Sequence, residues 1–405
     1  MTTWPQNARR EPAWNDRFSD RMAHVRASEI RELLKLLDQP DILSFAGGIP
    51  DPRLFPVARI AEAHADILAE AGEQALQYSV SEGLTPLRDW IAAKMSAMGA
   101  PCDAGNILVT SGSQQALDLI GRLFLSRGDT VLVERPTYMG ALGAFNAYEP
   151  AYAALEIGGT APAGAKLAYV VPDFANPTGR TLTRAQRTQL LDQAEAGDLA
   201  VVEDGAYREL RFAGAEEPTL LALDIQRCGD IEAARTLFCG TFSKTLSPAL
   251  RLGWVCGPRA VIDKLTLLKQ GCDLHASTIN QMVALRIVSE GYEAHLERLR
   301  THYRRQAAAM QAALARHMPL GVEWSHPQGG MFVWLRLPTG LDAAQLLQAA
   351  LGDERVAFVP GAPFFAVDPD PATLRLSYSL GGPDDIEEGV RRLARVIASR
   401  TARAA

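Results

Sequence analysis

Cysteine is scarce in this sequence, and its spacing suits neither metal binding nor cross-linking. The 405 residues contain five cysteines, none of them in a Cys-x-x-Cys pair: Cys102, Cys228, Cys239, Cys256 and Cys272. An odd number of scattered cysteines predicts neither a zinc knuckle nor a disulfide framework. We therefore expect a protein of a reducing compartment that holds no metal.

Long apolar runs are also missing. No stretch approaches the roughly 18–20 apolar residues that cross a bilayer as a helix. The opening residues, MTTWPQNARREPAW, lack the apolar centre of a secretory signal. We expect a cytoplasmic protein that does not bind membranes.

Positive charge is not in excess. The 41 Lys and Arg residues stand against 47 Asp and Glu residues, which gives a formal net charge of −6. A protein that binds nucleic acid uses a basic surface to neutralise phosphates, so we expect no nucleic-acid partner. With 47% hydrophobic and 22% charged residues, the composition is that of a folded globular chain.

The chain is longer than one ordinary domain of roughly 100–200 residues. From about residue 107, the apolar runs NILVT, DTVLVE, KLAYVV, LAVVED and TLFCG alternate with helical segments, which predicts a mainly parallel sheet with crossover helices. After residue 290, a charged helical stretch and the runs GMFVWLRL, VAFVP and TLRLSYS predict a smaller α/β unit. We expect an arm over residues 1–45 whose first helix begins at Ser28 in SEIRELLKLL, a large domain over 46–290 and a small domain over 291–405.

Polar residues follow the predicted strands, at the sheet edge where open parallel sheets bind ligands. NILVT leads into SGSQQALDLI, a helix start whose free amides suit a phosphate group. Ser111 or Ser113 as a simple helix cap explains the same residues. Asn176 follows KLAYVVPDF in an Asn-Pro-Thr-Gly segment that, taken alone, is typical of a turn.

Two further strand ends carry ionisable side chains. LAVVED brings Glu203 and Asp204 to a strand end with Tyr207 three residues later, and a carboxylate at the end of a buried strand requires a partner. TLFCG leads to Lys244, which precedes Arg251 by seven residues. A lysine solvated at the rim of the sheet explains this last segment if it is taken alone.

Taken together, these segments resemble the class I and II aminotransferases of fold type I, which use pyridoxal phosphate, and most closely the branch that contains the 2-aminoadipate and kynurenine aminotransferases. The resemblance runs from about Ser28 to about Val396, through SFAGGIPDPRLFP, QYSVSEGLTPLR, GSQQALDL, RPTYMGAL, FANPTG, VVEDGAYREL, FSKTLSPALRLGW, KQGCDLHAS, GGMFVWLRLP, VAFVPGAPFF and LRLSYS. It implies an α/β fold in which a large domain with a mainly parallel seven-stranded sheet, flanked by helices, binds the cofactor. A smaller α/β domain is then formed by the C-terminal part and the N-terminal arm.

The resemblance also implies roles for the residues at the strand ends. Lys244 carries pyridoxal phosphate as a Schiff base and moves the substrate proton, and Asp204 lies against the pyridine nitrogen. Asn176 and Tyr207 reach the phenolic oxygen of the cofactor. The other cofactor contacts are Tyr138 on the ring face, Ser113, Gln114, Ser243 and Arg251 at the phosphate, and Tyr78 from the second subunit of a homodimer.

Substrate contacts follow from the same resemblance. Arg375, with Asn176, binds the α-carboxylate as a bidentate arginine. Gly48 lets the backbone approach the substrate closely. Ser28 and Arg31 belong to an arm that covers the substrate side chain, where Arg31 meets a distal carboxylate. A solvated helix face explains Arg31 equally well.

This sequence departs from the family pattern in two places. Gly205 stands where relatives often carry a second acidic residue, and the chain is shorter around the loop GGTAPAGAK. Neither departure removes one of the residues assigned to catalysis.

The implied reaction is ping-pong transamination from an L-amino acid of the 2-aminoadipate, aromatic or branched-chain type to a 2-oxo acid, with 2-oxoglutarate the expected acceptor. Another reaction of the same cofactor, β-elimination or decarboxylation, is an alternative, because the orientation of the Cα bonds decides which bond breaks. A transcriptional regulator with an aminotransferase-like domain is a third hypothesis. It requires a basic winged-helix module, and only about 45 residues precede FAGG.

Overall fold

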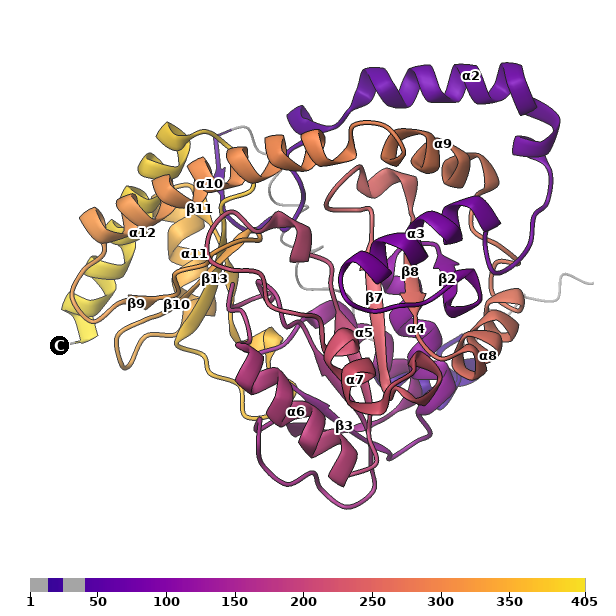
Figure 1. Ribbon diagram of the computed structural model, residues 1–405. Helices are drawn as coiled ribbons and strands as arrows, with labels where there is room; N and C mark the ends of the chain where they lie inside the picture. The colour runs from indigo at the N-terminus through magenta and orange to yellow at the C-terminus, as the bar shows by residue number, and fades with distance from the viewer. Residues whose placement is uncertain (1–13, 25–40, 405) are drawn as a thin grey trace, which may run out of the picture.

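Three β-sheets organise residues 14–24 and 41–404, which are the part of the chain that the computed structural model describes (Figure 1). The largest sheet has the strand order β2-β8-β7-β6-β5-β3-β4. Its strands are β2 (Ile107–Thr110), β3 (Thr130–Val133), β4 (Ala151–Ala154), β5 (Ala165–Val170), β6 (Ala200–Asp204), β7 (Thr236–Thr241) and β8 (Gly253–Cys256). Only β8 runs opposite to the other six strands, so the prediction of a mainly parallel seven-stranded sheet is confirmed.

The C-terminal part of the chain forms a smaller sheet to one side of the large one (Figure 1). Its order is β12-β13-β10-β9, with all pairs antiparallel, and the strands are β9 (Glu323–Trp324), β10 (Phe332–Arg336), β12 (Val359–Pro360) and β13 (Thr373–Ser377). A parallel pair joins β1 (Leu43–Ser44) to β11 (Val356–Ala357). The N-terminal segment therefore completes the small α/β unit, as expected, whereas the domain boundaries remain predictions.

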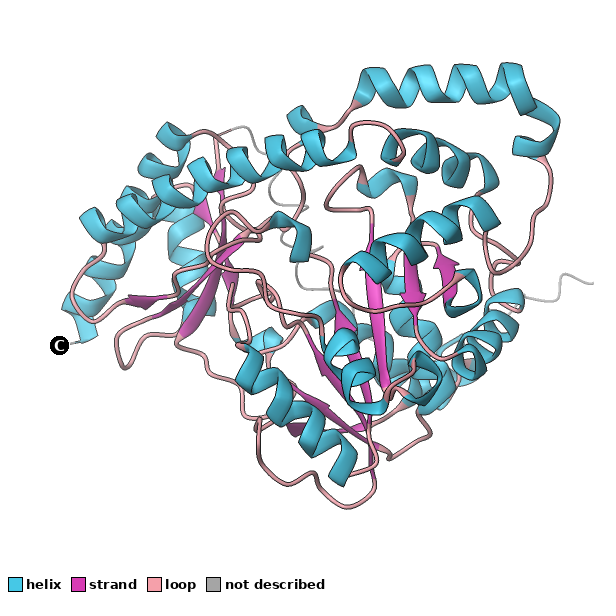
Figure 2. Ribbon diagram, in the orientation of Figure 1, coloured by secondary structure: helices cyan, strands magenta, loops and turns pink. Residues whose placement is uncertain are grey.

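Helices cover both faces of the large sheet (Figure 2). The helices are α2 (Val57–Leu76), α3 (Thr85–Ala97), α4 (Ser113–Phe124), α5 (Met139–Phe145), α6 (Arg184–Ala196), α7 (Leu220–Cys228), α8 (Arg259–Gln270), α9 (Thr278–Val288), α10 (Tyr292–His317), α11 (Ala343–Asp353) and α12 (Pro383–Ala404). Short 3-10 helices are η1 (Trp14–Arg17), η2 (Asp20–His24), η3 (Pro52–Leu54), η4 (Ala104–Asn106), η5 (Asn146–Tyr148), η6 (Arg208–Leu210), η7 (Ile231–Ala233), η8 (Pro248–Leu250) and η9 (Ala362–Phe364).

Strand alternation decides which side chains of β6 reach the site. Successive residues of a strand point to opposite faces of the sheet. Val201 packs in the cluster with α6 and α7, and Glu203, on the same face, accepts hydrogen bonds from the first amides of α7. Val202 packs on the other face, which Asp204 shares. The two consecutive acidic residues therefore serve different purposes.

The longest helix, α10, connects the two units. It packs against α12 in the small unit and also contacts η6 of the large one (Figure 1). The charged helical stretch predicted after residue 290 is thus confirmed. Residues 158–164 form the expected surface loop between β4 and β5, and Ala165 is the first residue of β5. The helix predicted from Ser28 lies outside the described residues. Over residues 14–24 and 41–404, no helix is long and apolar enough to span a membrane.

Candidate active site

Five segments that are far apart in the sequence meet around Lys244, the residue that follows β7 by three positions. Its Nζ atom donates to the carbonyl oxygen of Gly48 at 3.0 Å and lies 5.7 Å from the ring centre of Tyr207. Asn176 donates to the Tyr207 hydroxyl at 3.4 Å and accepts from Arg375 at 2.7 Å. The fold therefore brings together the residues that the sequence analysis placed at separate strand ends.

Lys244 lies in surroundings that favour its neutral amine. Burial lowers its pKa to about 8, and the positive charge of Arg375 acts in the same direction. The carboxylate of Asp204 partly opposes these effects. A lysine with this pKa has a substantial neutral fraction near neutral pH, as a nucleophile or a base requires.

Asp204 is a buried carboxylate held by two hydrogen bonds. Its Oδ2 atom accepts from the hydroxyl of Tyr169 at 2.8 Å, and its Oδ1 atom accepts from the amide of Ala206 at 3.1 Å. Burial raises the pKa of Asp204, whereas these bonds and the charge of Lys244 lower it. The carboxylate is thus oriented and suited to a cationic partner within the site.

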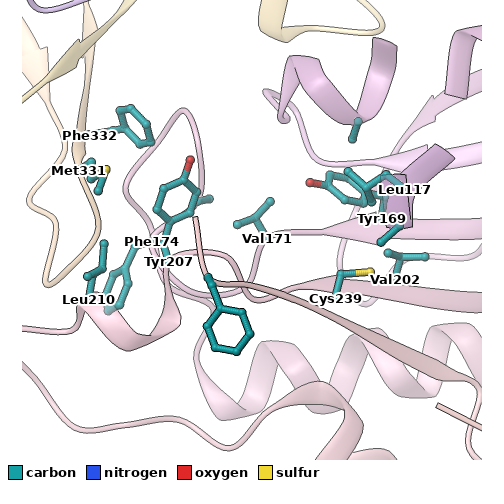
Figure 3. Packing of buried hydrophobic residues seen from close by; sticks show 14 of the residues in the cluster. Leu117, Tyr169, Val171, Phe174, Val202, Tyr207, Leu210, Cys239, Met331 and Phe332 are labelled. Atoms are coloured by element: carbon teal, nitrogen blue, oxygen red, sulfur yellow. The ribbon is translucent and has the colours of Figure 1, made fainter. Parts of the chain in front are cut away.

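Tyr207 closes the site on the side of the small sheet. Its ring packs edge-on against Phe332 of β10, with ring centres 5.5 Å apart. Figure 3 shows these two rings at the end of the apolar cluster that contains Tyr169. Burial raises the pKa of the Tyr207 hydroxyl, which therefore stays protonated and able to donate.

Arg375 is a cation buried without an acidic partner. Its side chain is 1% exposed and lies between the rings of Phe332 and Phe364, and burial lowers its pKa to about 10. Its Nη atoms donate to Asn176 Oδ1 and to the carbonyl of Ala46, while Nε has no partner. No carboxylate of the described residues forms an ion pair with it. A buried guanidinium in this state is suited to a small carboxylate ligand.

The start of α4 forms a second polar end of the site. Gly112 precedes the helix with φ +89°, and a Cβ atom there would lie 2.6 Å from Nη2 of Arg251. Arg251 donates to the carbonyl of Ser111 at 3.1 Å, and no described carboxylate pairs with it. Ser113 begins the helix, so its free amide and the helix dipole join the guanidinium in favouring an anion.

Neighbouring residues complete this end of the site. Gln114 donates to the carbonyl of Gly140 at 2.7 Å, and the ring of Tyr138 lies against Gly140, where a Cβ atom would be 2.3 Å from Cζ. Burial and the charge of Asp204 raise the pKa of Tyr138. The Ser243 hydroxyl lies 3.0 Å from that of Thr241.

The comparisons with known proteins agree with this geometry. The family model described as aminotransferase class I and II matches residues 40–150 and 165–393. The chain belongs to the class I and II aminotransferases. The 2-aminoadipate transaminase of Thermus thermophilus is 43% identical over 396 residues, which cover 95% of this chain and 97% of that protein.

Two solved structures extend the comparison. The α-aminoadipate aminotransferase of Thermus thermophilus, complexed with N-(5′-phosphopyridoxyl)-L-leucine, has a TM-score of 0.87 and 42% identity and covers 96% of this chain and 100% of its own. The kynurenine aminotransferase of Pyrococcus horikoshii has a TM-score of 0.88 and 40% identity, and covers 96% and 98%. This aminotransferase accordingly uses pyridoxal phosphate and transfers an amino group between an amino acid and a 2-oxo acid.

The residues of the site fit that cofactor. The start of α4 and Arg251 offer an anion site without an acidic competitor, and Asp204 offers a buried carboxylate for a protonated ring nitrogen. Lys244 offers the amine. Within residues 14–24 and 41–404, no group of three or more His, Cys, Asp and Glu side chains is arranged to hold a metal ion.

Among the predicted site residues that the structure describes, Tyr78 lies apart from this group. Tyr78 lies between α2 and α3, is 78% exposed, and contacts the ring of His275 edge-on with centres 5.9 Å apart. Ser28 and Arg31 lie outside the described residues.

Several contributors to the site were missed by sequence reasoning. Tyr169 pairs with Val202 across β5 and β6, two residues before Asp204, but the sequence alone does not reveal this register. Phe332 and Phe364 come from the small unit. Packing also bears on Gly205, which stands where relatives often carry a second acidic residue. A Cβ atom there would lie 2.3 Å from Cζ of Phe238, so a side chain would collide with that ring.

Proposed function

We propose that this aminotransferase works by a ping-pong mechanism that converts an L-amino acid into its 2-oxo acid and then aminates a second 2-oxo acid, with 2-oxoglutarate as acceptor. The observation that carries the proposal is the buried Arg375 near Lys244, whose pKa burial lowers to about 8. Arg375 is the one buried guanidinium of the described site without an acidic partner. Donor and acceptor each carry a carboxylate next to the reacting carbon, so they would occupy the same position in turn.

The cofactor contacts are proposed as follows. Asp204 keeps the ring nitrogen protonated, and its bond from Tyr169 fixes the carboxylate in place. Asn176 and Tyr207 donate to the phenolic oxygen. The remaining contacts are Tyr138 on the ring face and Ser113, Gln114, Ser243 and Arg251 at the phosphate.

Bound pyridoxal phosphate supplies an electron sink for the charge that develops at Cα of the substrate. Lys244 would hold the cofactor through its Nζ atom, and the same atom, when free, would take the proton from Cα of the substrate and later return a proton. Arg375 and Asn176 hold the α-carboxylate and so orient the Cα–H bond toward Nζ. Gly48 leaves room for this approach, because a Cβ atom there would lie 3.0 Å from Cζ of Phe332 and 3.8 Å from Nη1 of Arg375.

For the amino donor we propose the 2-aminoadipate, aromatic or branched-chain type. The relatives named 2-aminoadipate transaminase and kynurenine aminotransferase support this range, as do the aromatic walls around Arg375.

Arg31, on the arm of residues 1–45, is proposed to meet a distal carboxylate. Arg31→Ala should then weaken kcat/KM for 2-aminoadipate and glutamate by about 1.5–3 kcal/mol and spare leucine. Equal losses for all donors would contradict this role.

We further propose a homodimer in the cytoplasm, in which Tyr78 reaches the phosphate of the partner subunit. Its support is the exposure of Tyr78 together with neighbouring apolar side chains, Leu76, Val80 and Leu274.

The proposed units are the arm 1–45, the large cofactor-binding domain 46–290 and the small domain 291–405. The cytoplasmic location rests on the odd number of scattered cysteines.

The test of the function is a half-reaction. The purified holoenzyme is mixed with single amino acids, and the absorbance change from the pyridoxal to the pyridoxamine form is recorded. We expect conversion without release of ammonia or carbon dioxide, and reversal on addition of 2-oxoglutarate. Release of ammonia or carbon dioxide in step with turnover would instead support the β-lyase or decarboxylase alternative.

A further inference from the structure

Four polar side chains form a closed hydrogen-bond network behind the start of α4: Ser111, Gln115, Lys269 and Asp273. Asp273 accepts from the Ser111 hydroxyl at 2.8 Å, from Gln115 Nε2 at 2.7 Å and from Lys269 Nζ at 2.6 Å. Gln115 Oε1 accepts from the Ser111 amide at 2.8 Å and from Lys269 Nζ at 3.1 Å. Each member thus contacts at least two others.

This network is partly buried, and its two opposite charges balance. The Lys269 side chain is fully buried and that of Asp273 is 28% exposed, and they form an ion pair between the last turn of α8 and the segment that follows it. The attraction within a buried ion pair offsets the cost of desolvation only where hydrogen bonds satisfy the remaining polar atoms, as they do here. A change in one partner would leave the other charged and unmatched.

The network ends at the proposed phosphate site. The Ser111 carbonyl accepts from Arg251, and Ser111 is followed by Gly112 and the free amide of Ser113. Gly112 lies so close to Arg251 that a Cβ atom would collide with it. The position of the Ser111 backbone therefore sets the positions of both the helix amides and the guanidinium.

We propose that Asp273, together with Lys269, is a positioning residue for the cofactor phosphate, which it serves by fixing the turn 111–113 against Arg251. The proposal rests on the proposed function of the α4 start as the phosphate site. The hydrogen bonds of the two side chains go to Ser111, Gln115 and each other, and not to Arg251 or the Ser113 amide. Their effect passes through Ser111 and Gln115.

A positioning role and a simple charge effect predict different results. Asp273→Asn adds a net positive charge near the phosphate, and Lys269→Met removes one. A charge effect alone would tighten binding of pyridoxal phosphate in the first variant and weaken it in the second. A positioning role predicts that both variants weaken it, because both break the same network.

The experiment measures the dissociation constant of pyridoxal phosphate and the 31P chemical shift of the bound phosphate in the holoenzyme and in both variants. We expect the dissociation constant to rise roughly 10–100-fold in both, the range found when hydrogen bonds behind directly ligating groups are lost. The 31P shift should move in both. Unchanged binding in Asp273→Asn, or changes of opposite sign in the two variants, would overturn the proposal.

Asp224 offers a matched control for loss of stability. It is a buried aspartate that also accepts three hydrogen bonds, from Arg235 N, Thr236 N and Thr236 Oγ1, at the end of β7 opposite to the site. Asp224→Asn should lower the urea midpoint of the apoprotein while leaving cofactor binding unchanged. If it weakens binding as much as Asp273→Asn, the effect of Asp273 is general destabilisation and the proposal fails.

The variant Arg251→Ala distinguishes a failure of the positioning role from a failure of the proposed phosphate site. If Arg251→Ala weakens cofactor binding and Asp273→Asn does not, only the positioning role is overturned. If Arg251→Ala leaves binding unchanged, the phosphate site itself is wrongly assigned, and the positioning role falls with it.

Discussion

The ε-amine of Lys244 has a pKa of about 8 because it is buried close to Arg375. Only the neutral amine attacks an aldehyde, so capture of pyridoxal phosphate by the apoprotein should accelerate as the pH rises through about 8 and level off above it. A lysine of ordinary pKa, near 10.4, would continue to accelerate to about pH 10. Stopped-flow absorbance, with an Nα-blocked lysine as the reference amine, measures the profile.

A second experiment identifies the lysine to which the cofactor is attached. Borohydride reduction followed by peptide mapping should place the pyridoxyl group on the peptide that contains Lys244. Lys264→Ala, an exposed position on α8, should leave the label in place, and Lys244→Ala should abolish it. A label on any other peptide would contradict the assignment.

Substitutions at Asp204 and Tyr169 test, with a large and a small effect, whether Asp204 pairs with the ring nitrogen of the cofactor. Asp204→Asn removes the charge and should lower kcat on the order of 10²–10³-fold, with a much smaller loss of bound cofactor. Tyr169→Phe removes one hydrogen bond to the same carboxylate and should cost roughly tenfold in kcat. Steady-state rates and cofactor content are measured for each. An Asn variant with most of its turnover would show that another group protonates the ring.

At single positions, sequence reasoning succeeded where chemistry is local and failed where it depends on register. Asp204 and Glu203 were both placed at a strand end, and only the observed packing assigns Glu203 to the start of α7 and Asp204 to the site. The partner of Asp204, Tyr169, lies on a neighbouring strand. Side chains that meet across a sheet are fixed by strand pairing, which no local pattern of residues encodes.

Among the elements, β8 lies directly against the start of α4. A Cβ atom on Gly253 would lie 2.8 Å from both the Ser113 amide nitrogen and the Gly240 carbonyl. Gly253→Ala should therefore destabilise the fold by about 1–3 kcal/mol and weaken cofactor binding, because backbone atoms cannot yield as a flexible side chain does. Urea unfolding and cofactor titration measure both effects.

A second glycine serves as the control. Gly143 lies exposed within α5 with no atom near its would-be Cβ. Gly143→Ala should stabilise the protein by about 0.4–1 kcal/mol, since alanine favours the helix and restricts the unfolded chain. Equal effects of the two substitutions would contradict the packing argument at Gly253.

The five apolar runs singled out in the sequence correspond to β2, β3, β5, β6 and β7. The two strands not among them have physical reasons to escape notice. β4 is a partly exposed edge strand with alanines at three of four positions, and β8, with the sequence GWVC, begins with a glycine and runs antiparallel to its neighbours. Strand length does not separate these two from the five, since β2 and β3 also have four residues. An edge position and an antiparallel pairing are set by the whole fold rather than by local composition.

At the scale of the whole molecule, mixed dimers test the proposed active site to which both subunits contribute residues. Subunits with Lys244→Ala and subunits with Tyr78→Ala should both be inactive as homodimers. Random mixing should restore about a quarter of the wild-type activity, since half of the dimers are mixed and each of these has one intact site of two. Absence of recovery after confirmed subunit exchange, or an active monomer, would contradict the proposed role of Tyr78.

The uncompensated charge of Arg375 also affects how the protein should be handled. A guanidinium that lacks a carboxylate partner accepts acetate, succinate or citrate from the buffer as well as a substrate. A bound buffer ion would raise the melting temperature and compete with amino acids, with a stabilisation of about 2.7 kcal/mol at 100 times its dissociation constant. Purification in such buffers would thus favour a robust protein with an apparently high KM, and chloride buffers would reveal its intrinsic substrate affinity.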